Sequence, residues 1–155
     1  MPMPTEDDIQ RMHRYFAVEC NNNAWELAER AERTGDEEEE MIRLSEVAAW
    51  HWSKVGTAIN FARADMLRGW VCCLVGWAGD ARAYADRVST QLQARPEGMS
   101  AWDSAFTALL EAYARRTESD EPGFQAALDG LDTHRAALDE DDQQIFDQFR
   151  SRIAP

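Results

Sequence analysis

One histidine, and the polar side chains that helix packing would bring beside it, are the residues best suited to chemistry. His51 lies in a predicted helix that follows a turn at Gly35. In an antiparallel helix pair, residues at equal distances from the turn lie opposite each other. A turn at Gly35 therefore places Glu19 opposite His51, with Asn22 or Asn23 nearby. A histidine held by a carboxylate can act as a general base.

The next turn extends this predicted cluster to a third helix. Gly56 marks that turn, so Trp52 is expected to meet Asn60, and Arg63 lies about one helical turn further on. Asn and Arg together could bind an anionic or amide ligand, with Trp50 and Trp52 as walls. The predicted ligand-binding residues are Glu19, Asn23, His51, Trp52, Asn60 and Arg63. The alternative is a structural hydrogen-bond network that satisfies a buried histidine between helices.

Other catalytic patterns are missing from the sequence. The histidines are scattered, and there is no Glu-x-x-His, His-Glu-x-x-His or Cys-x-x-Cys motif. Cys20, Cys72 and Cys73 occupy predicted packed positions, and no basic neighbour is evident for the last two that would lower a thiol pKa. The Gly76–Gly79 segment lacks the lysine of a phosphate-binding loop. We therefore predict no metal, no cofactor and no catalytic residue.

Composition restricts the class of partner. The chain has 155 residues, enough for one domain, and a net charge of −13. That charge argues against nucleic acid and against anionic membranes. No run approaches the roughly 18 apolar residues of a membrane span. Arginine outnumbers lysine, of which Lys54 is the single example, and this usage resembles that of GC-rich bacterial genomes.

The first residues of the sequence predict where the folded domain begins, and the cysteines predict the cellular compartment. Residues 1–4 read as a disordered leader without the basic start and apolar core of a signal peptide, and residues 5–155 as one helical domain. Three cysteines form no disulfide framework, and adjacent Cys72 and Cys73 would point about 100° apart on a helix. These features predict a cytoplasmic protein with reduced thiols.

About seven helices are expected. Thr5, followed by Asp8, caps the first, over about residues 6–33, which either runs through Asn21–Asn23 or breaks there. Gly35 is expected to end it and Gly56 to end the second. The third, after Thr57, is apolar nearly all round, which predicts the central element. The remaining four cover about residues 80–94, 100–116, 122–137 and 139–153.

Part of this pattern resembles the tetratricopeptide repeat. Gly69 is small where the first helix of a repeat would cross its partner, Gly76 lies at the turn, and Ala81, Ala85 and Val88 occupy the small or apolar positions of the second helix. Departures are Asp65, Cys72 and Pro96, which differ in type or spacing from the family pattern. A looser second copy runs from Leu110 and Tyr113 to Ala127, Leu131 and His134. A plain helical bundle is the alternative.

The resemblance implies stacked antiparallel helical hairpins, an all-α fold, and a concave groove lined by the first helix of each hairpin. It also implies a protein-interaction module that binds a partner segment in that groove. The family's carboxylate clamp uses several lysines, so the single lysine here argues against it. Competing hypotheses are a helical-bundle enzyme or small-ligand protein using the His51 cluster, and a homodimer formed through an exposed apolar end of the stack.

The tryptophans divide between core and other positions. Trp70 and Trp102 fall on predicted core stripes, whereas Trp25, Trp50 and Trp77 fall off them. Exposed tryptophan is enriched in binding hot spots. Filling the seam between stacked hairpins is the other use of such side chains.

Overall fold

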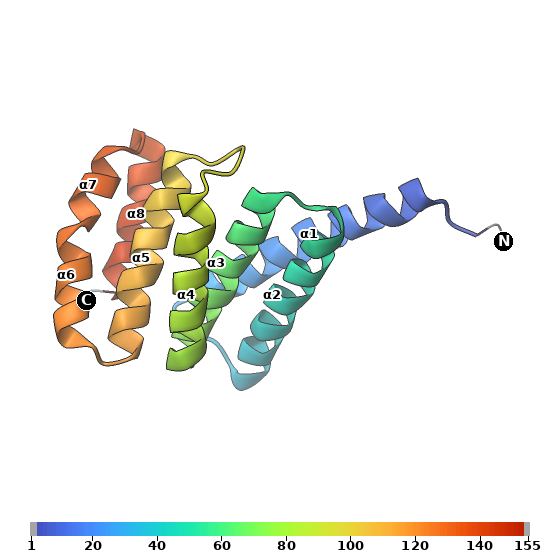
Figure 1. Cartoon of the computed structure of the whole chain (residues 1–155). Coiled ribbons are helices and arrows are strands. Elements are labelled where there is room, and N and C mark those ends of the chain that lie inside the picture. Colours follow the sequence, from blue (N-terminus) through green and yellow to red (C-terminus); the bar gives the residue numbers. More distant parts are fainter. Residues whose placement is uncertain (1–2, 154–155) are drawn as a thin grey trace.

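The computed structural model describes residues 3–153, and its regular structure there is entirely helical (Figure 1). This confirms the all-α fold predicted from the sequence. The predicted leader, residues 1–4, lies partly outside the described residues. The helices are α1 (Glu6–Glu29), α2 (Gly35–Val55), α3 (Ala58–Leu74), α4 (Ala78–Gln93), α5 (Ala101–Thr117), α6 (Glu121–Asp129), α7 (Leu131–Ala136) and α8 (Glu140–Ile153).

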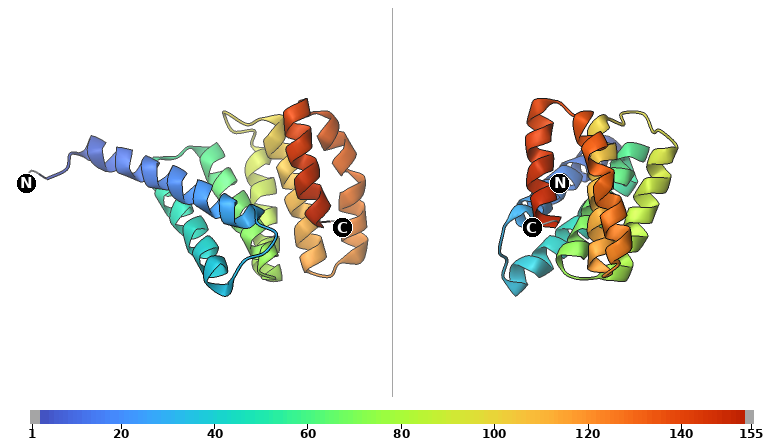
Figure 2. Two further views of the ribbon diagram at one scale, coloured as in Figure 1. Left: turned by 180° about the vertical axis from the view of Figure 1, so that it is seen from behind. Right: turned by 90° about the vertical axis from the view of Figure 1, so that its left-hand side faces the viewer.

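The helices pair as antiparallel hairpins that stack in chain order. α1 packs on α2, α3 on α4, and α5 on α6 and α7, while α8 returns to pack on α5. The first helices of the hairpins also touch one another, since α3 contacts both α1 and α5. Figures 1 and 2 show α3 in the middle of this arrangement. The packing is consistent with the predicted stacked hairpins, and it places α3 at the centre.

Helix starts follow local capping signals. The Thr5 backbone N–H donates to the Asp8 carboxylate at 3.0 Å, as predicted, and Thr34 donates to Glu37 at 2.9 Å in the same way. At the start of α3, the Thr57 backbone N–H donates to the side-chain oxygen of Asn60 at 3.0 Å. Such reciprocal contacts satisfy backbone N–H groups that have no partner within the helix. α1 runs without interruption through Asn21–Asn23.

Two helix boundaries differ from expectation. α1 ends at Glu29 rather than near residue 33, and Gly35 begins α2 instead of stopping α1. The reason is the Thr34 cap, which starts α2 early and leaves only residues 30–34 for the turn. The predicted sixth helix divides at Gly130 into α6 and α7.

The core centres on α3, which buries eleven of its residues. Trp70 is fully buried, and its ring lies 5.1 Å from that of Phe149 and 5.2 Å from that of Phe106. Gly69 permits close packing beside it, because a Cβ atom there would lie 3.0 Å from side-chain atoms of Tyr84 and Leu110. Among residues 3–153, no helix is both long and apolar enough to cross a membrane.

Candidate functional site

The structure gives His51 a different neighbour from the one expected. Its Nδ1 atom lies 2.8 Å from Nδ1 of His13. Because the turn between α1 and α2 is centred on residue 32 and not on residue 35, the pairing shifts by about six residues along α1. The ring of Phe16 lies 5.5 Å from that of His51, and the ring of Trp50 lies 4.9 Å away. His51 therefore belongs to an aromatic group, with no hydrogen bond to Glu19 among the described residues.

The other predicted site residues are distributed over separate places. Arg63 bonds to Asp103 of α5, and Asn60 accepts hydrogen bonds at the start of its own helix. Trp52 is half-buried. Asn23 lines a shallow groove between α1 and α2 that also contains Glu40. The structure thus does not assemble these residues into one ligand site.

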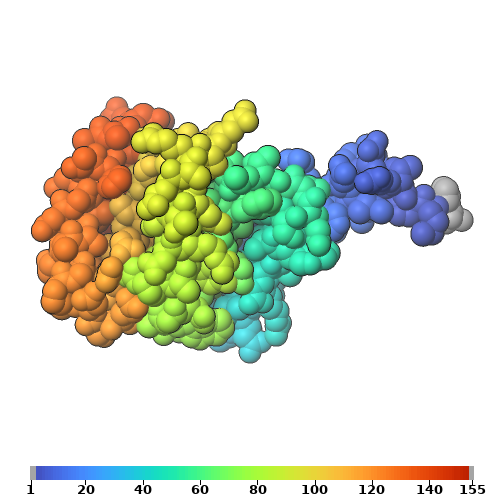
Figure 3. Space-filling view, viewed as in Figure 1, coloured from blue at the N-terminus to red at the C-terminus, as the bar shows by residue number. Residues whose placement is uncertain are grey.

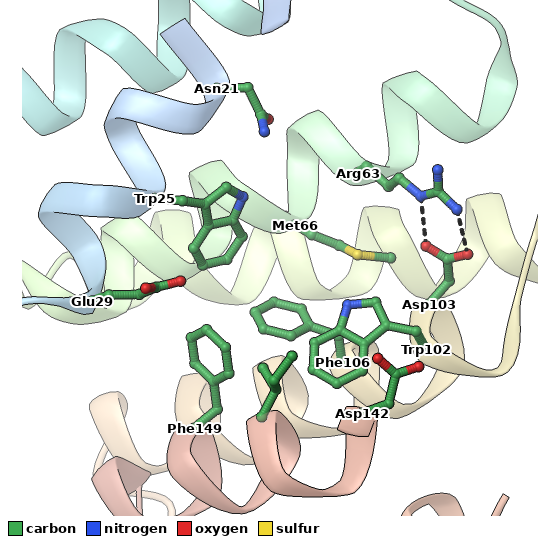
Figure 4. A pocket seen from close by; sticks show the side chains of 11 residues that line it. Asn21, Trp25, Glu29, Arg63, Met66, Trp102, Asp103, Phe106, Asp142 and Phe149 are labelled. Carbon is green, nitrogen blue, oxygen red and sulfur yellow. Dashed lines mark hydrogen bonds and ion pairs between the residues drawn. The ribbon is translucent and has the colours of Figure 1, made fainter. Parts of the chain in front are cut away.

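A different hollow, which is mostly apolar, is the better candidate site (Figure 4). It is an open cavity of about 590 Å³, which we call the cup. Its walls come from α1, α3, α5 and α8, the first helix of each hairpin together with the last helix. The lining residues are Asn21, Trp25, Glu29, Arg63, Met66, Trp102, Asp103, Phe106, Asp142, Ile145 and Phe149.

Helical spacing explains why each wall contributes these side chains. On α1, Asn21, Trp25 and Glu29 are four residues apart, and residues at that spacing share one face of a helix. On α8, Ile145 and Phe149 have the same spacing. The cup is therefore lined by continuous faces of regular helices, which hold their side chains more precisely than loops do.

The cup is closed at one side because α8 returns to the end of α1 (Figure 2). Arg152 donates to the backbone carbonyls of Ala28 at 3.3 Å and of Glu29. Arg116 of α5 donates in turn to the backbone carbonyl of Ile153 at the end of α8. A cation is stabilised at the C-terminal end of a helix, where carbonyl groups lack partners and the dipole is negative. These two arginines link three of the walls, α1, α5 and α8.

Aromatic rings form the floor of the cup. The ring of Phe106 lies 5.3 Å from Trp25, 5.9 Å from Trp102 and 5.2 Å from Phe149. The Trp25 and Phe149 rings meet Phe106 at nearly right angles, a geometry that aromatic quadrupoles favour. Phe106 and Phe149 are buried, whereas Trp25 and Trp102 are partly exposed. The two tryptophans therefore offer apolar surface to a ligand.

One ion pair fixes the rim between α3 and α5. Arg63 donates to both carboxylate oxygens of Asp103, at 2.8 and 2.9 Å, and to the carbonyl of Gly98 at 3.2 Å. The Ser100 backbone N–H adds a bond to Asp103 at 2.8 Å. Burial raises the pKa of Asp103, but the bonds from Arg63 and Ser100 outweigh it and leave the pKa below its ordinary value. The positive charge of Arg63 is therefore neutralised by Asp103 within the protein.

Two further carboxylates remain at the rim. Glu29 is exposed and Asp142 is partly exposed, and Figure 4 shows them at opposite sides of the aromatic floor. Since Arg63 and Asp103 balance each other, the side chains that line the cup carry a net negative charge from Glu29 and Asp142, and Arg152 lies just outside the lining, at the backbone of Glu29. Such a site favours a cationic group on a ligand.

The thiols and metal ligands lie elsewhere. Burial raises the pKa of Cys72 to about 11 and that of Cys73 to about 12, so both remain protonated at neutral pH. Thiols in this state are weak nucleophiles. Within residues 3–153, no group of three or more His, Cys, Asp or Glu side chains is placed to hold a metal ion.

Sequence reasoning identified Arg63 but missed the rest of the cup. Trp25 falls off the predicted main stripes and Trp102 falls on a predicted core stripe, yet nothing local indicated that α8 folds back to α1. The spacing of Asn21, Trp25 and Glu29 was the available signal. Comparison of the chain with protein-family models, curated proteins and solved structures found no match.

Proposed function

We propose that the chain is a non-enzymatic, tetratricopeptide-like interaction module that binds a segment of a partner protein in the cup. The observation that carries this proposal is the convergence of four helices on one hollow with an aromatic floor and an acidic rim. Ligand sites are typically concave, mostly apolar, and equipped with a few polar groups that orient the ligand. The cup has each of these properties.

The chemistry of the lining defines the partner segment. Trp25 and Trp102 suit an aliphatic or aromatic anchor, and Glu29 and Asp142 suit a lysine or arginine. A cation between these carboxylates could also lie over an indole face. The expected ligand is therefore a short basic and apolar segment, and an acidic segment would be repelled.

The size of the cup agrees with a segment rather than a whole domain. Its volume of about 590 Å³ lies in the range of roughly 300–1,000 Å³ found for small-molecule sites, so it has room for a few side chains of a partner segment. The free cysteines and the arginine-rich composition support a proposed location of this activity in the cytoplasm of a bacterial cell. The net charge of −13 supports the further proposal that nucleic acids and anionic membranes are not partners.

A peptide selection tests the proposal directly. A random peptide library displayed on phage is selected on the whole protein, and the enriched peptides are then titrated calorimetrically. We expect enrichment of peptides that combine Arg or Lys with an aromatic or large aliphatic residue. Their affinity should fall about tenfold in the double variant Glu29→Gln, Asp142→Asn, which removes the rim charges and keeps side-chain size.

The matched control removes the same charge elsewhere. Glu32 and Asp129 are exposed and lie outside the cup, so the double variant Glu32→Gln, Asp129→Asn changes the net charge equally. It should leave the affinity nearly unchanged. Equal losses in both double variants would show that only overall charge matters, and selection of acidic peptides would contradict the proposal.

A further inference from the structure

The opposite end of the stack carries an exposed apolar surface. α1 and α2 form the first hairpin, and the first turns of α1 project beyond the body (Figures 1 and 3). Six large apolar side chains on this hairpin are each about half exposed. They are Ile9 (44%), Met12 (54%), Tyr15 (59%), Phe16 (41%), Val47 (41%) and Trp50 (54%), and we call them the outer face.

The outer face is one connected surface. On α1, Ile9, Met12 and Phe16 follow each other at helical spacings of three and four residues, so they share one side. The ring of Tyr15 lies 5.3 Å from Phe16, and Phe16 reaches Trp50 of α2 through the ring of His51.

Stacked helical arrays need polar residues on their terminal hairpins, because an end hairpin has a neighbour on one side only. α1 and α2 contact α3 on that side. Their outer face is apolar instead of polar. A single exposed apolar residue needs no explanation, but a contiguous patch of this kind indicates an interaction surface.

We infer that the outer face is a homodimer interface, at which two copies of the chain meet across a two-fold axis. The available area supports a second copy as the occupant. Six side chains of roughly 200 Å² each, about half exposed, present on the order of 600 Å². A stable interface buries about 800 Å² per partner, of which about 65% is apolar in homodimers, so the patch matches the apolar part.

The distribution of charge also favours contact at this end. The net charge of −13 makes two copies repel each other overall. Residues 5–20 and 47–55, which include the outer face, carry four acidic and three basic residues and are therefore almost neutral. Lys54 lies 5.1 Å from the centre of the Trp50 ring and adds a cation at the edge of the patch. Repulsion between two copies at the outer face is thus weaker than the net charge of the whole chain suggests.

A two-fold contact through the outer face would leave the cup open. The cup is lined by the C-terminal half of α1 together with α3, α5 and α8, and it shares no residue with the outer face. The dimer would therefore present two cups. Two linked sites raise the overall affinity for a repeated or dimeric partner without any new contact.

The test is sedimentation velocity of the whole protein over a range of low to high micromolar concentration. We expect a dimer whose dissociation constant rises at least about tenfold in Met12→Glu, because a buried unpaired charge is costly. Met12 is exposed on a helix surface, so this variant should fold normally, with an unchanged circular dichroism spectrum. Trp50→Glu should act in the same way.

Trp77→Glu is the matched control. Trp77 is similarly exposed at 46% but lies at the start of α4, away from the outer face. It should remain dimeric. A wild-type protein that stays monomeric across the range would overturn the inference, and so would a Met12→Glu protein that dimerises as well as the wild type or a Trp77→Glu protein that dissociates equally.

Discussion

The protein contains two aromatic clusters that differ in how far they are covered. Beneath the floor of the cup, the ring of Trp70 meets the rings of Phe106 and Phe149 at 5.1–5.2 Å, and all three are buried. On the first hairpin, the rings of Phe16 and Trp50 are about half exposed and enclose two histidines. Aromatic side chains thus stabilise the fold where they are buried beneath the cup. On the first hairpin they are exposed and therefore available for association.

The largest effect should come from the covered cluster. Trp70→Ala removes a fully buried ring and leaves a cavity between α3, α5 and α8, which should lower the free energy of unfolding by about 3–5 kcal/mol. Chemical denaturation measures this loss. Trp77→Ala removes an exposed ring of the same type and should cost well under half as much; equal losses would remove the distinction between covered and exposed rings.

Close helix packing at Gly69 should give the next largest effect. Gly69→Val places side-chain atoms where a Cβ alone would lie 3.0 Å from Tyr84 and Leu110. Overpacking of this kind should destabilise the protein by about 1–3 kcal/mol, measured by denaturant unfolding. Gly79→Val is the comparison, since a Cβ at Gly79 meets nothing within 4 Å. A stable Gly69→Val protein would show that the α3, α4 and α5 contact is loose.

The buried ion pair at the cup should matter more than an exposed one. Asp103→Asn removes the charge that Arg63 pairs with and should cost about 1–2 kcal/mol, whereas Asp147→Asn at the exposed Arg135 pair should cost about 0–1 kcal/mol. Thermal unfolding compares the two variants. Because the folded pKa of Asp103 lies below 3.8, its contribution is present above that pH and is lost as pH falls through the folded pKa.

The smallest effect concerns the histidines of the exposed cluster. Burial, and then the proximity of His13, lower the pKa of His51 below its ordinary 6.5. The folded state therefore binds fewer protons than the unfolded state near that pH. The contribution of neutral His51 to the free energy of unfolding should be fully present above about pH 6.5, and it should be lost as the pH falls through the folded pKa of His51.

His51→Gln tests this origin of the pH dependence. The variant removes the titrating ring, so the decline in melting temperature between about pH 7 and pH 5 should be smaller than in the wild type. His134→Gln, on α7, is the control and should retain the wild-type decline. If the melting temperature declined equally with pH in the wild type and in both variants, titrating groups other than His51 would dominate between about pH 7 and pH 5.

Local sequence signals predicted the helices well because capping and apolar periodicity act over a few residues. Thr5 and Thr57 mark helix starts as expected, and α3, which is apolar nearly all round, is central. The boundary at Gly35 was wrong, since a glycine there looks like a helix stop unless the competing Thr34 cap is weighed. That error of a few residues moved the predicted partner of His51 from His13 to Glu19.

The cup could not be predicted because it depends on contacts between distant parts of the chain. Arg152 reaches the carbonyl groups at the end of α1, more than a hundred residues away. No periodicity within one helix reports such a contact. Arg63 was predicted from the pairing of α2 with α3, but its partner Asp103 comes from α5, which that pairing does not include.

The central claim is that the cup binds the partner segment, and the six tryptophan indole N–H signals in a nuclear magnetic resonance titration test it most directly. A selected basic and apolar peptide is added at constant protein concentration. We predict that the signals of Trp25 and Trp102 move while those of Trp50 and Trp77 stay in place. Movement of Trp50 with unchanged Trp25 and Trp102 would contradict the account and assign partner binding to the outer face.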